Sequence, residues 1–389
     1  MTSSVKRGWH FLQIPGPSNT PNRVLQAIAQ PTIDHRGPAF GELTLDLLPK
    51  LQNVFQTTGS VVVYPSSGTG AWEAALVNLF QPGDKILAYE TGHFSNLWKN
   101  LAEKIGLKVK TIASDWRRGV EAHRIKEALA ADDTHEIKAV MVVHNETSTG
   151  VTSNLEAVRK AIDEVQHPAL LLVDVVSSLG TTPFYQDKWG IDVAIAASQK
   201  GFMLPPGLGF NSINDKALKI AQQNQALNSY WQWDRIIEMN EKGYYPYTPA
   251  SNLLFGLQEA LNMILEEGLP TLFNRHAKLA KATRMAAKVW GLENQCLVEN
   301  EFSDSTTALI VPGGKADELR KIVLDQFNMS LGTGLGQLKG KVFRIGHLGD
   351  FNELMLCATL SGVEMGLQIA GIPHQKGGVQ AAMDFLTES

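Results

Sequence analysis

Short apolar runs separated by helical patterns are the feature that most constrains the fold of this chain. The runs cover residues 61–64, 140–143, 170–173 and 193–197, and a similar run follows Lys85. Runs of strand length that are apolar at every position indicate strands covered on both faces, which is typical of parallel sheets. Because helical patterns lie between them, the sequence predicts an α/β fold with a mostly parallel sheet. Ligands of such folds gather at the carboxyl ends of the strands.

Length and composition bound the number of domains and the class of protein. The chain has 389 residues, of which 44% are hydrophobic, so we expect a large core and two domains. Strand and helix patterns alternate again from Thr307 onward and predict a smaller second domain that begins near residues 260–270. A net charge of −4 gives no reason to expect binding to nucleic acid or to an anionic membrane.

The cysteines and the apolar segments indicate a compartment. The two cysteines, Cys296 and Cys357, lack metal-ligand spacing and cannot form a disulfide framework. No signal peptide is recognised, and no apolar run reaches the length that crosses a bilayer. We therefore expect a soluble protein of the reducing cytosol.

Two charged residues come directly after predicted strands. Lys200 follows the run 193–197 in a segment rich in glycine and proline, and Asp174 ends the run 170–173. Most lysines are solvated surface charges, and a carboxylate at a strand end can simply cap the next segment. One short crossover separates Asp174 from Lys200, so both face one pocket if their strands are neighbours.

A glycine-containing segment, residues 66–70, joins the strand 61–64 to a predicted helix. Its glycines allow close backbone approach, and a helix N-terminus presents free N–H groups and a positive dipole to a phosphate. The segment is not a P-loop, because no Gly-Lys-Ser/Thr follows, and a dinucleotide fingerprint fails at Glu73. An ordinary tight turn is the alternative interpretation.

A second polar cluster, residues 144–150, follows the strand 140–143. Such a cluster at a strand end more often forms a binding site than a plain turn. HEXXH spacing is absent, so we predict no zinc site and no other metal centre.

These parts have a common chemical logic. A lysine amine can hold an aldehyde cofactor as a Schiff base, and a carboxylate on the far side of the ring can keep a pyridine nitrogen protonated. A glycine-rich helix start can hold a phosphate. Phosphate, pyridinium and aldehyde are the three handles of pyridoxal 5′-phosphate, which is the cofactor that the combination predicts.

A set of motifs occurs in a fixed order along the chain: Pro15-Gly16-Pro17-Ser18-Asn19, Ser67-Gly68-Thr69-Gly70, His144-Asn145-Glu146-Thr147, Val173-Asp174-Val175-Val176-Ser177-Ser178, Ser198-Gln199-Lys200-Gly201, residues 332–336 and residues 343–349. In these motifs and their order, the sequence resembles the class V aminotransferases over nearly its whole length, and most closely the serine–glyoxylate and alanine–glyoxylate aminotransferases. The resemblance implies a fold type I pyridoxal phosphate enzyme. The large domain would contain a mostly parallel seven-stranded sheet, and a smaller α/β domain would follow.

The resemblance assigns roles around the cofactor. Lys200 would be the Schiff-base lysine and proton shuttle, and Asp174 would pair with the pyridine nitrogen. Phe94 would stack on the ring, with His93 as the competing candidate. Further cofactor-binding residues would be Ser67, Gly68, Thr69, Gly70 and Gln199 at the phosphate, and either Thr147 or Ser148 at the ring hydroxyl.

The substrate side is implied in the same way. Arg344 would bind the substrate α-carboxylate through a bidentate pair, and a buried arginine inside an apolar strand needs such an anion. Asn19 and Gly16 would line the same side. Arg36 is a candidate second cation for the side chain of the donor, and a solvated arginine is the alternative.

The resemblance also implies a partner and a division of the chain. Tyr245 and Thr248 match residues that close the phosphate site of a second subunit, so we expect a homodimer with shared active sites. The predicted division is an N-terminal arm at 1–20, a large domain at 21–262 that binds the cofactor, and a small domain at 263–389.

The predicted reaction moves the amino group of a small amino acid to glyoxylate, giving glycine and a 2-oxo acid such as hydroxypyruvate. Serine is the favoured donor, and aspartate and alanine are the alternatives. Another reaction on the same fold, such as desulfuration, would need a mobile thiol, and Cys296 does not lie in a loop near Lys200. A non-catalytic binding protein would be expected to lack Lys200 or Asp174.

Overall fold

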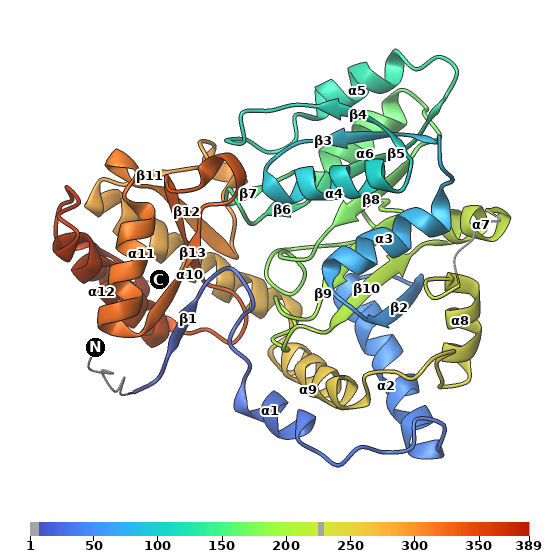
Figure 1. Ribbon diagram of the computed structural model, residues 1–389, viewed down its shortest axis with the longest axis horizontal. Coiled ribbons are helices and arrows are strands. Elements are labelled where there is room, and N and C mark those ends of the chain that lie inside the picture. Colours follow the sequence, from blue (N-terminus) through green and yellow to red (C-terminus); the bar gives the residue numbers. More distant parts are fainter. Residues whose placement is uncertain (1–7, 225–228, 389) are drawn as a thin grey trace.

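The computed structural model describes residues 8–224 and 229–388, which form two large sheets with helices packed around each (Figure 1). A third, two-stranded sheet pairs β6 (Asn145–Glu146) with β7 (Val151–Thr152). The first seven residues of the predicted N-terminal arm, and Ser389, lie outside the described residues. The larger sheet is formed by residues 60–213, and the smaller one mostly by residues from 293 to 346.

The larger sheet has seven strands in the order β2-β10-β9-β8-β5-β3-β4. All neighbouring pairs from β9 to β4 are parallel, and β10 is antiparallel to both of its neighbours. The expectation of a mostly parallel seven-stranded sheet is therefore confirmed. The strands are β2 (Ser60–Pro65), β3 (Lys85–Tyr89), β4 (Lys108–Ile112), β5 (Ile137–Val143), β8 (Leu170–Asp174), β9 (Val193–Ala197) and β10 (Leu208–Ile213).

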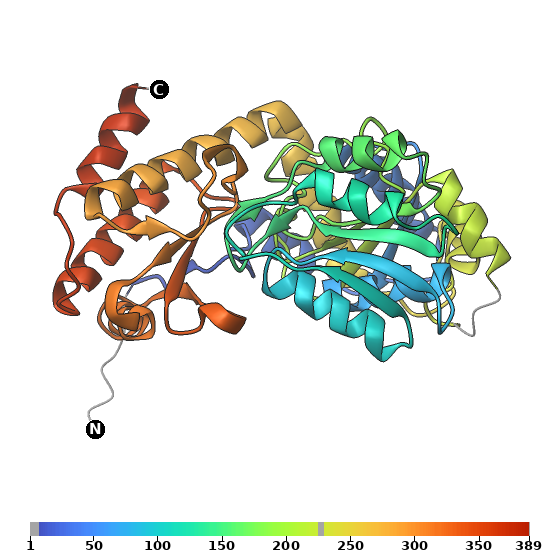
Figure 2. The ribbon, with the colours of Figure 1, turned by 90° about the horizontal axis from the view of Figure 1, so that it is seen from above.

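Side chains of alternate residues along these strands enter two separate cores, because successive strand residues point to opposite faces. On β5, Val140 and Val142 belong to one core, while Met141 and Val143 belong to the other. Helices cover both faces, as the view from above shows (Figure 2). The first face is covered by α2 (Pro38–Phe55), α5 (Ala122–Ala130), α6 (Leu155–Glu164) and α9 (Ser251–Glu267), and the second by α3 (Gly68–Leu79), α4 (His93–Lys104), α7 (Asp215–Gln223) and α8 (Trp233–Glu241).

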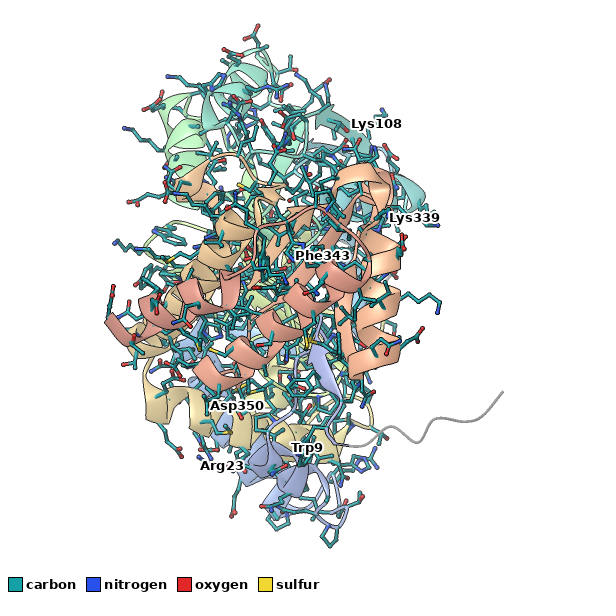
Figure 3. All side chains as sticks on the ribbon, turned by 90° about the vertical axis from the view of Figure 1, so that its left-hand side faces the viewer. Trp9, Arg23, Lys108, Lys339, Phe343 and Asp350 are labelled. Atoms are coloured by element: carbon teal, nitrogen blue, oxygen red, sulfur yellow. The ribbon has the colours of Figure 1, made fainter. Side chains whose placement is uncertain are left out.

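The smaller sheet has the order β1-β13-β14-β12-β11 and a core of its own. Phe343 of β14 is fully buried in that core and lies near the centre of Figure 3, behind the helices that cover the sheet. The elements are β11 (Glu293–Asn294), β12 (Thr306–Ile310), β13 (Met329–Thr333) and β14 (Val342–Gly346), with α10 (Leu269–Trp290), α11 (Ala316–Phe327), α12 (Glu353–Ile369) and α13 (Gly378–Glu388).

The segment after Gly8 connects the two sheets. Strand β1 (Phe11–Gln13) adds to the smaller sheet in parallel with β13. The turn that follows, before α1 (Asn22–Ile28), contacts the loop after β9, because Ser18 donates through its amide to the Gln199 carbonyl and through its hydroxyl to the Lys200 carbonyl, each at 2.9 Å. The end of the predicted arm, at Ser18, is therefore held against the Lys200 loop.

Several elements were not predicted from the sequence, among them β10 and α8. Strand β10 contains Gly209, Asn211 and Ser212, which interrupt the apolar pattern, and it becomes a strand because it fills the gap between β2 and β9. Helix α8 lies within an aromatic region for which the sequence predicted no helix. The predicted domain boundary after residue 262 falls inside α9, and the division of the chain into domains stays a prediction.

The described residues also bear on metals and membranes. Neither cysteine forms a disulfide, with Cys296 buried and Cys357 partly exposed. Within residues 8–224 and 229–388, no cluster of three or more His, Cys, Asp or Glu side chains is arranged to hold a metal ion. Over the same residues, no helix combines the length and apolar character needed to cross a membrane.

The close approach of α3 to the sheet gives a test of the packing. A Cβ atom on Gly209 would lie 2.6 Å from the Ser67 carbonyl oxygen and 3.2 Å from the Ala71 side chain, at the start of α3. We expect Gly209→Ala to lower the free energy of unfolding by about 1–3 kcal/mol, because the helix must shift to admit the methyl group. Ser212→Ala on the same strand is the control, since the Ser212 hydroxyl is buried without a hydrogen-bond partner in the described structure. Denaturant unfolding with equal losses for the two variants would contradict this account.

Candidate active site

A cavity of about 270 Å³ lies at the carboxyl ends of the central strands, where the fold predicts ligands. Its volume is near the lower end of the usual range for small-molecule pockets, about 300–1,000 Å³. Its walls come from the starts of α3 and α4, the ends of β5 and β8, the loop after β9 and the turn after β1. The lining residues are Gly16, Pro17, Ser67, Gly68, Thr69, Trp72, Phe94, Val143, Asn145, Thr147, Asp174, Val176, Ser177, Gln199, Lys200 and Pro206.

Parallel pairing of β8 with β9 brings Asp174 and Lys200 to the same edge of the sheet. Asp174 is the last residue of β8 and pairs with Ile195, and Lys200 follows the end of β9 by three residues. Both side chains line the cavity and both residues are buried. The two strands are neighbours, and this is the condition under which the sequence analysis expected Asp174 and Lys200 to share a pocket.

The Lys200 ammonium group lies against the turn after β1 and donates a hydrogen bond to the Pro15 carbonyl. A Cβ atom on Gly16 would collide with the far end of the Lys200 side chain, and the φ of +102° at Gly16 is a backbone conformation that favours glycine. Burial and, to a smaller extent, the charge of Arg344 lower the pKa of Lys200 while Asp174 raises it, and the net result is a pKa of about 8. About half of such amines are neutral at pH 8, which suits a nucleophile and proton carrier.

The Asp174 carboxylate is held by one donor on each oxygen. The Val176 amide donates to Oδ1 at 2.7 Å, and the indole N–H of Trp72 donates to Oδ2 at 3.0 Å. Burial raises the pKa of Asp174 to about 7 and the charge of Glu146 raises it too, while both hydrogen bonds and Lys200 lower it. A cationic nitrogen in front of this carboxylate would keep it ionised.

The start of α3 presents hydrogen-bond donors to the cavity. Ser67 is the N-cap and makes no side-chain capping bond, and the first helical hydrogen bond joins the Ala71 amide to the Ser67 carbonyl. The amides of Gly68, Thr69 and Gly70 therefore have no acceptor within the helix. Gly70 does not line the cavity, and a Cβ atom there would collide with the Ser66 hydroxyl. This end of the cavity can accept an anion.

Neighbouring side chains separate the alternatives that the sequence left open. Phe94 lines the cavity, whereas His93 does not and makes an edge contact with the Phe94 ring at 5.6 Å between centroids. Thr147 lines the cavity, whereas the Ser148 hydroxyl donates to Glu146 at 2.6 Å and accepts from the His93 amide. The geometry therefore favours Phe94 and Thr147 as the ligand-facing residues of each pair.

The predicted substrate residues lie at different distances from the cavity. Arg344 is buried on β14 and donates to the carbonyls of Thr333 and Thr147, each at 2.8 Å, so its guanidinium lies directly behind a cavity-lining residue. Burial lowers the pKa of Arg344 to about 10. Asn19 does not line the cavity, and its amide donates to the Leu12 carbonyl at 3.2 Å.

Three further candidates lie away from the cavity of their own chain. Thr248 is exposed, and the ring of Tyr245 is buried against Phe40 at 6.1 Å between centroids. Arg36 is exposed and does not line the cavity, and its backbone amide donates to the Asp34 carboxylate at 2.9 Å. Among the described side chains that line the cavity, Lys200 is the only cation.

The sequence did not single out two residues that organise the site. Trp72 lines the cavity and holds Asp174, as described above. Glu146 is fully buried, and its carboxylate accepts the amides of Phe94 and Ser95 at the start of α4. The available signal was weak, because a tryptophan in an apolar helix predicts core packing, and Glu146 was only one member of a polar cluster. His144 of that cluster faces Ser178 rather than the cavity, and burial lowers its pKa to about 3.

The site fits pyridoxal 5′-phosphate in three independent respects. The start of α3 suits the phosphate, Asp174 suits a protonated pyridine nitrogen, and Lys200 suits the aldehyde. The Gln199 side-chain oxygen, which is buried at the cavity without a hydrogen-bond partner in the described structure, indicates that a polar group belongs there.

Comparisons with known proteins agree with this geometry. A family model described as aminotransferase class V matches residues 10–336. A serine–glyoxylate aminotransferase from Methylorubrum extorquens is 47% identical over 100% of this chain and 99% of its own length. An L-aspartate–glyoxylate aminotransferase from Paracoccus denitrificans is 43% identical over 97% of this chain and 96% of its own.

A solved structure gives the same result for the fold. The crystal structure of an alanine–glyoxylate aminotransferase from Nostoc sp. superposes with a TM-score of 0.87 at 30% identity. The superposition covers 94% of this chain and 97% of the Nostoc chain. Since the family model spans most of the sequence and close relatives align over nearly all of it, the chain belongs to the class V aminotransferase family.

Proposed function

We propose that the protein is a pyridoxal phosphate-dependent aminotransferase that moves the amino group of serine to glyoxylate, giving glycine and hydroxypyruvate. The observation that carries this proposal is that Lys200 and Asp174 line one cavity, and that the start of α3, with its free amides, lines the same cavity. Relatives named for serine and for glyoxylate support the choice of substrates.

The chain's own residues supply the positioning and the proton transfer. When bound, the cofactor supplies an aldehyde that takes up the amino group and a ring that withdraws electrons from the carbon atom that loses a proton. Lys200 would hold the cofactor, and its Nζ would take the proton from the substrate Cα and pass it to the carbon atom on the other side of the transferred nitrogen. Asp174 would keep the pyridine nitrogen protonated, and Phe94 at the start of α4 would pack on the ring.

Arg344 binds the α-carboxylate of each substrate. Its recorded partners are two backbone carbonyls, which orient the guanidinium without neutralising its charge. A buried cation held in this way gains most from an anionic ligand. Serine and glyoxylate both carry the required carboxylate.

The choice of serine over aspartate rests on the charge of the cavity wall. The side-chain carboxylate of aspartate would need a second cation, and Lys200, the one cationic lining residue among those described, is used for the cofactor. Arg36 is exposed and does not line the cavity. Aspartate is nevertheless the second candidate, because a relative named for it is 43% identical.

The desulfurase alternative has no support in the site. The Cys296 thiol is buried outside the cavity and lies 3.6 Å from the carbonyls of Val298 and Glu301. Burial raises its pKa to about 11, so the thiolate that desulfuration needs is disfavoured.

We infer that the working unit is a homodimer in the cytosol. Thr248 is exposed in the single chain and is free to reach a second subunit, and Tyr245 lies three residues before it. Because Tyr245 is packed against Phe40, its ring would contribute from a fixed position. The unpaired cysteines fit a reducing compartment.

The first prediction from the proposed function concerns Lys200. We expect Lys200→Ala to lower kcat on the order of a thousandfold or more, because the chain loses its proton carrier. The purified variant should also lack the visible absorption of a cofactor bonded to lysine. Lys339→Ala, which removes an exposed lysine (Figure 3), is the control and should keep both properties. Absorption and turnover that survive in Lys200→Ala would refute the assignment.

The second prediction concerns the donor. Glycine formation from glyoxylate should show the highest kcat/KM with serine when serine, alanine and aspartate are compared side by side. If aspartate exceeds serine by more than about tenfold, a difference of about 1.4 kcal/mol in transition-state binding, the donor assignment is wrong.

The third prediction concerns the carboxylate site. We expect Arg344→Gln to lower kcat/KM by on the order of a hundredfold for both serine and glyoxylate, because a charge-assisted pair is lost. The cofactor absorption should stay, which shows that the variant folds. Arg36→Ala is the matched control and should leave both kcat/KM values unchanged. A loss confined to one substrate would show that Arg344 does not bind the group they share.

A further inference from the structure

Trp72 touches the Asp174 carboxylate directly, although its position in an apolar helix predicts only core packing. It lies on α3, five residues after Ser67, and its indole N–H donates to Asp174 Oδ2 at 3.0 Å. The residue is 4% exposed and lines the cavity. The helix that offers its first amides to an anion therefore also fixes the carboxylate at the other end of the same cavity.

The indole of Trp72 is held rigidly. It stacks on Trp98 of α4 with 5.9 Å between centroids and 13° between planes, and both rings belong to the core on that face of the sheet. The N–H of Trp98 is also buried, but it has no hydrogen-bond partner in the described structure. The two tryptophans thus lie in the same core, and of their two indole N–H groups only that of Trp72 makes a hydrogen bond to a residue of the cavity.

We propose that Trp72 is a positioning residue that orients the Asp174 carboxylate and favours its ionised form at the pyridine nitrogen of the cofactor. An indole N–H can only donate, and so can the Val176 amide on the other oxygen. A proton on Asp174 would have to avoid both donors, so the pair disfavours the neutral acid. The inference rests on the proposed function, because it assigns Trp72 to the cofactor of that reaction.

The charges around Asp174 explain why such a donor matters. Burial raises the pKa of Asp174 and the Glu146 carboxylate opposes its ionisation, while Lys200, the Val176 amide and Trp72 favour it. With the pKa at about 7, removal of one donor leaves much of Asp174 protonated near neutral pH. A protonated Asp174 cannot hold a cationic ring nitrogen.

The test compares Trp72→Phe with Trp98→Phe. The probe is pyridoxamine 5′-phosphate, which has the ring nitrogen and phosphate of the cofactor but no aldehyde to bond to Lys200. At pH 8 we expect Trp72→Phe to weaken its binding about tenfold, as for loss of a hydrogen bond to a charged group, and Trp98→Phe to leave it unchanged. The pH below which affinity is lost should rise in Trp72→Phe alone, because Asp174 then takes up its proton at a higher pH.

A double-mutant cycle shows whether Trp72 acts through Asp174. In an Asp174→Asn background, Trp72→Phe should weaken binding much less than it does in the wild type. If Trp72→Phe does not fold, benzothienylalanine at position 72 keeps the bicyclic shape and lacks only the N–H donor. Equal affinities and equal pH limits for the Trp72 and Trp98 variants, or for the benzothienylalanine protein and the wild type, would overturn this inference. If the wild type itself binds neither pyridoxamine 5′-phosphate nor pyridoxal 5′-phosphate, the proposed function fails instead.

Discussion

The parallel pairing of β8 with β9 is the constraint on which the site depends. It places a carboxylate and an amine of opposite charge at one buried edge, where both charged forms are disfavoured by loss of water. The pKa of Asp174 rises to about 7 and that of Lys200 falls to about 8. Each group therefore has a pKa close to neutral pH, the range in which its charge changes. A cofactor that presents a cation to Asp174 and an electrophile to Lys200 would stabilise the ionised carboxylate and react with the neutral amine.

The loop after β5 connects this edge to the smaller sheet. The Asn145 amide donates to Ser177, next to the β8 strand end, and to Ser305, beside β12, each at 2.8 Å. Two residues later, the Thr147 carbonyl accepts from Arg344. In the proposed function, a substrate would place its amino group at Lys200 on one sheet and its carboxylate at Arg344 on the other, so the relative position of the sheets would determine how well it fits. The loop after β5 contributes to that position through contacts on both sides.

The sequence predicted what depends on local pattern. Continuous apolar runs located β5, β8 and β9, and the ends of those runs located Asp174 and Lys200. Strand β10 was missed because its own Gly-Phe-Asn-Ser pattern carries no strand signal and one of its two partners, β2, is distant in the sequence. The choice between Phe94 and His93 was also beyond the sequence, since it depends on how the start of α4 is turned, and Glu146 on a different element determines that.

Glu146 shows why such residues escape pattern analysis. Its carboxylate is fully buried, and its recorded partners are the amides of Phe94, Ser95 and Ser148 and the Ser148 hydroxyl. Free amides at a helix start stabilise an anion without any basic side chain. The contact between Glu146 and the start of α4 therefore leaves no charge pattern in the sequence from which it could be predicted. The same carboxylate raises the pKa values of Asp174 and Arg344. Glu146 therefore positions the start of α4, from which Phe94 lines the cavity, and it disfavours the ionised form of Asp174. The hydrogen bond from Trp72 acts in the opposite direction, which is the physical basis of the positioning role proposed for it.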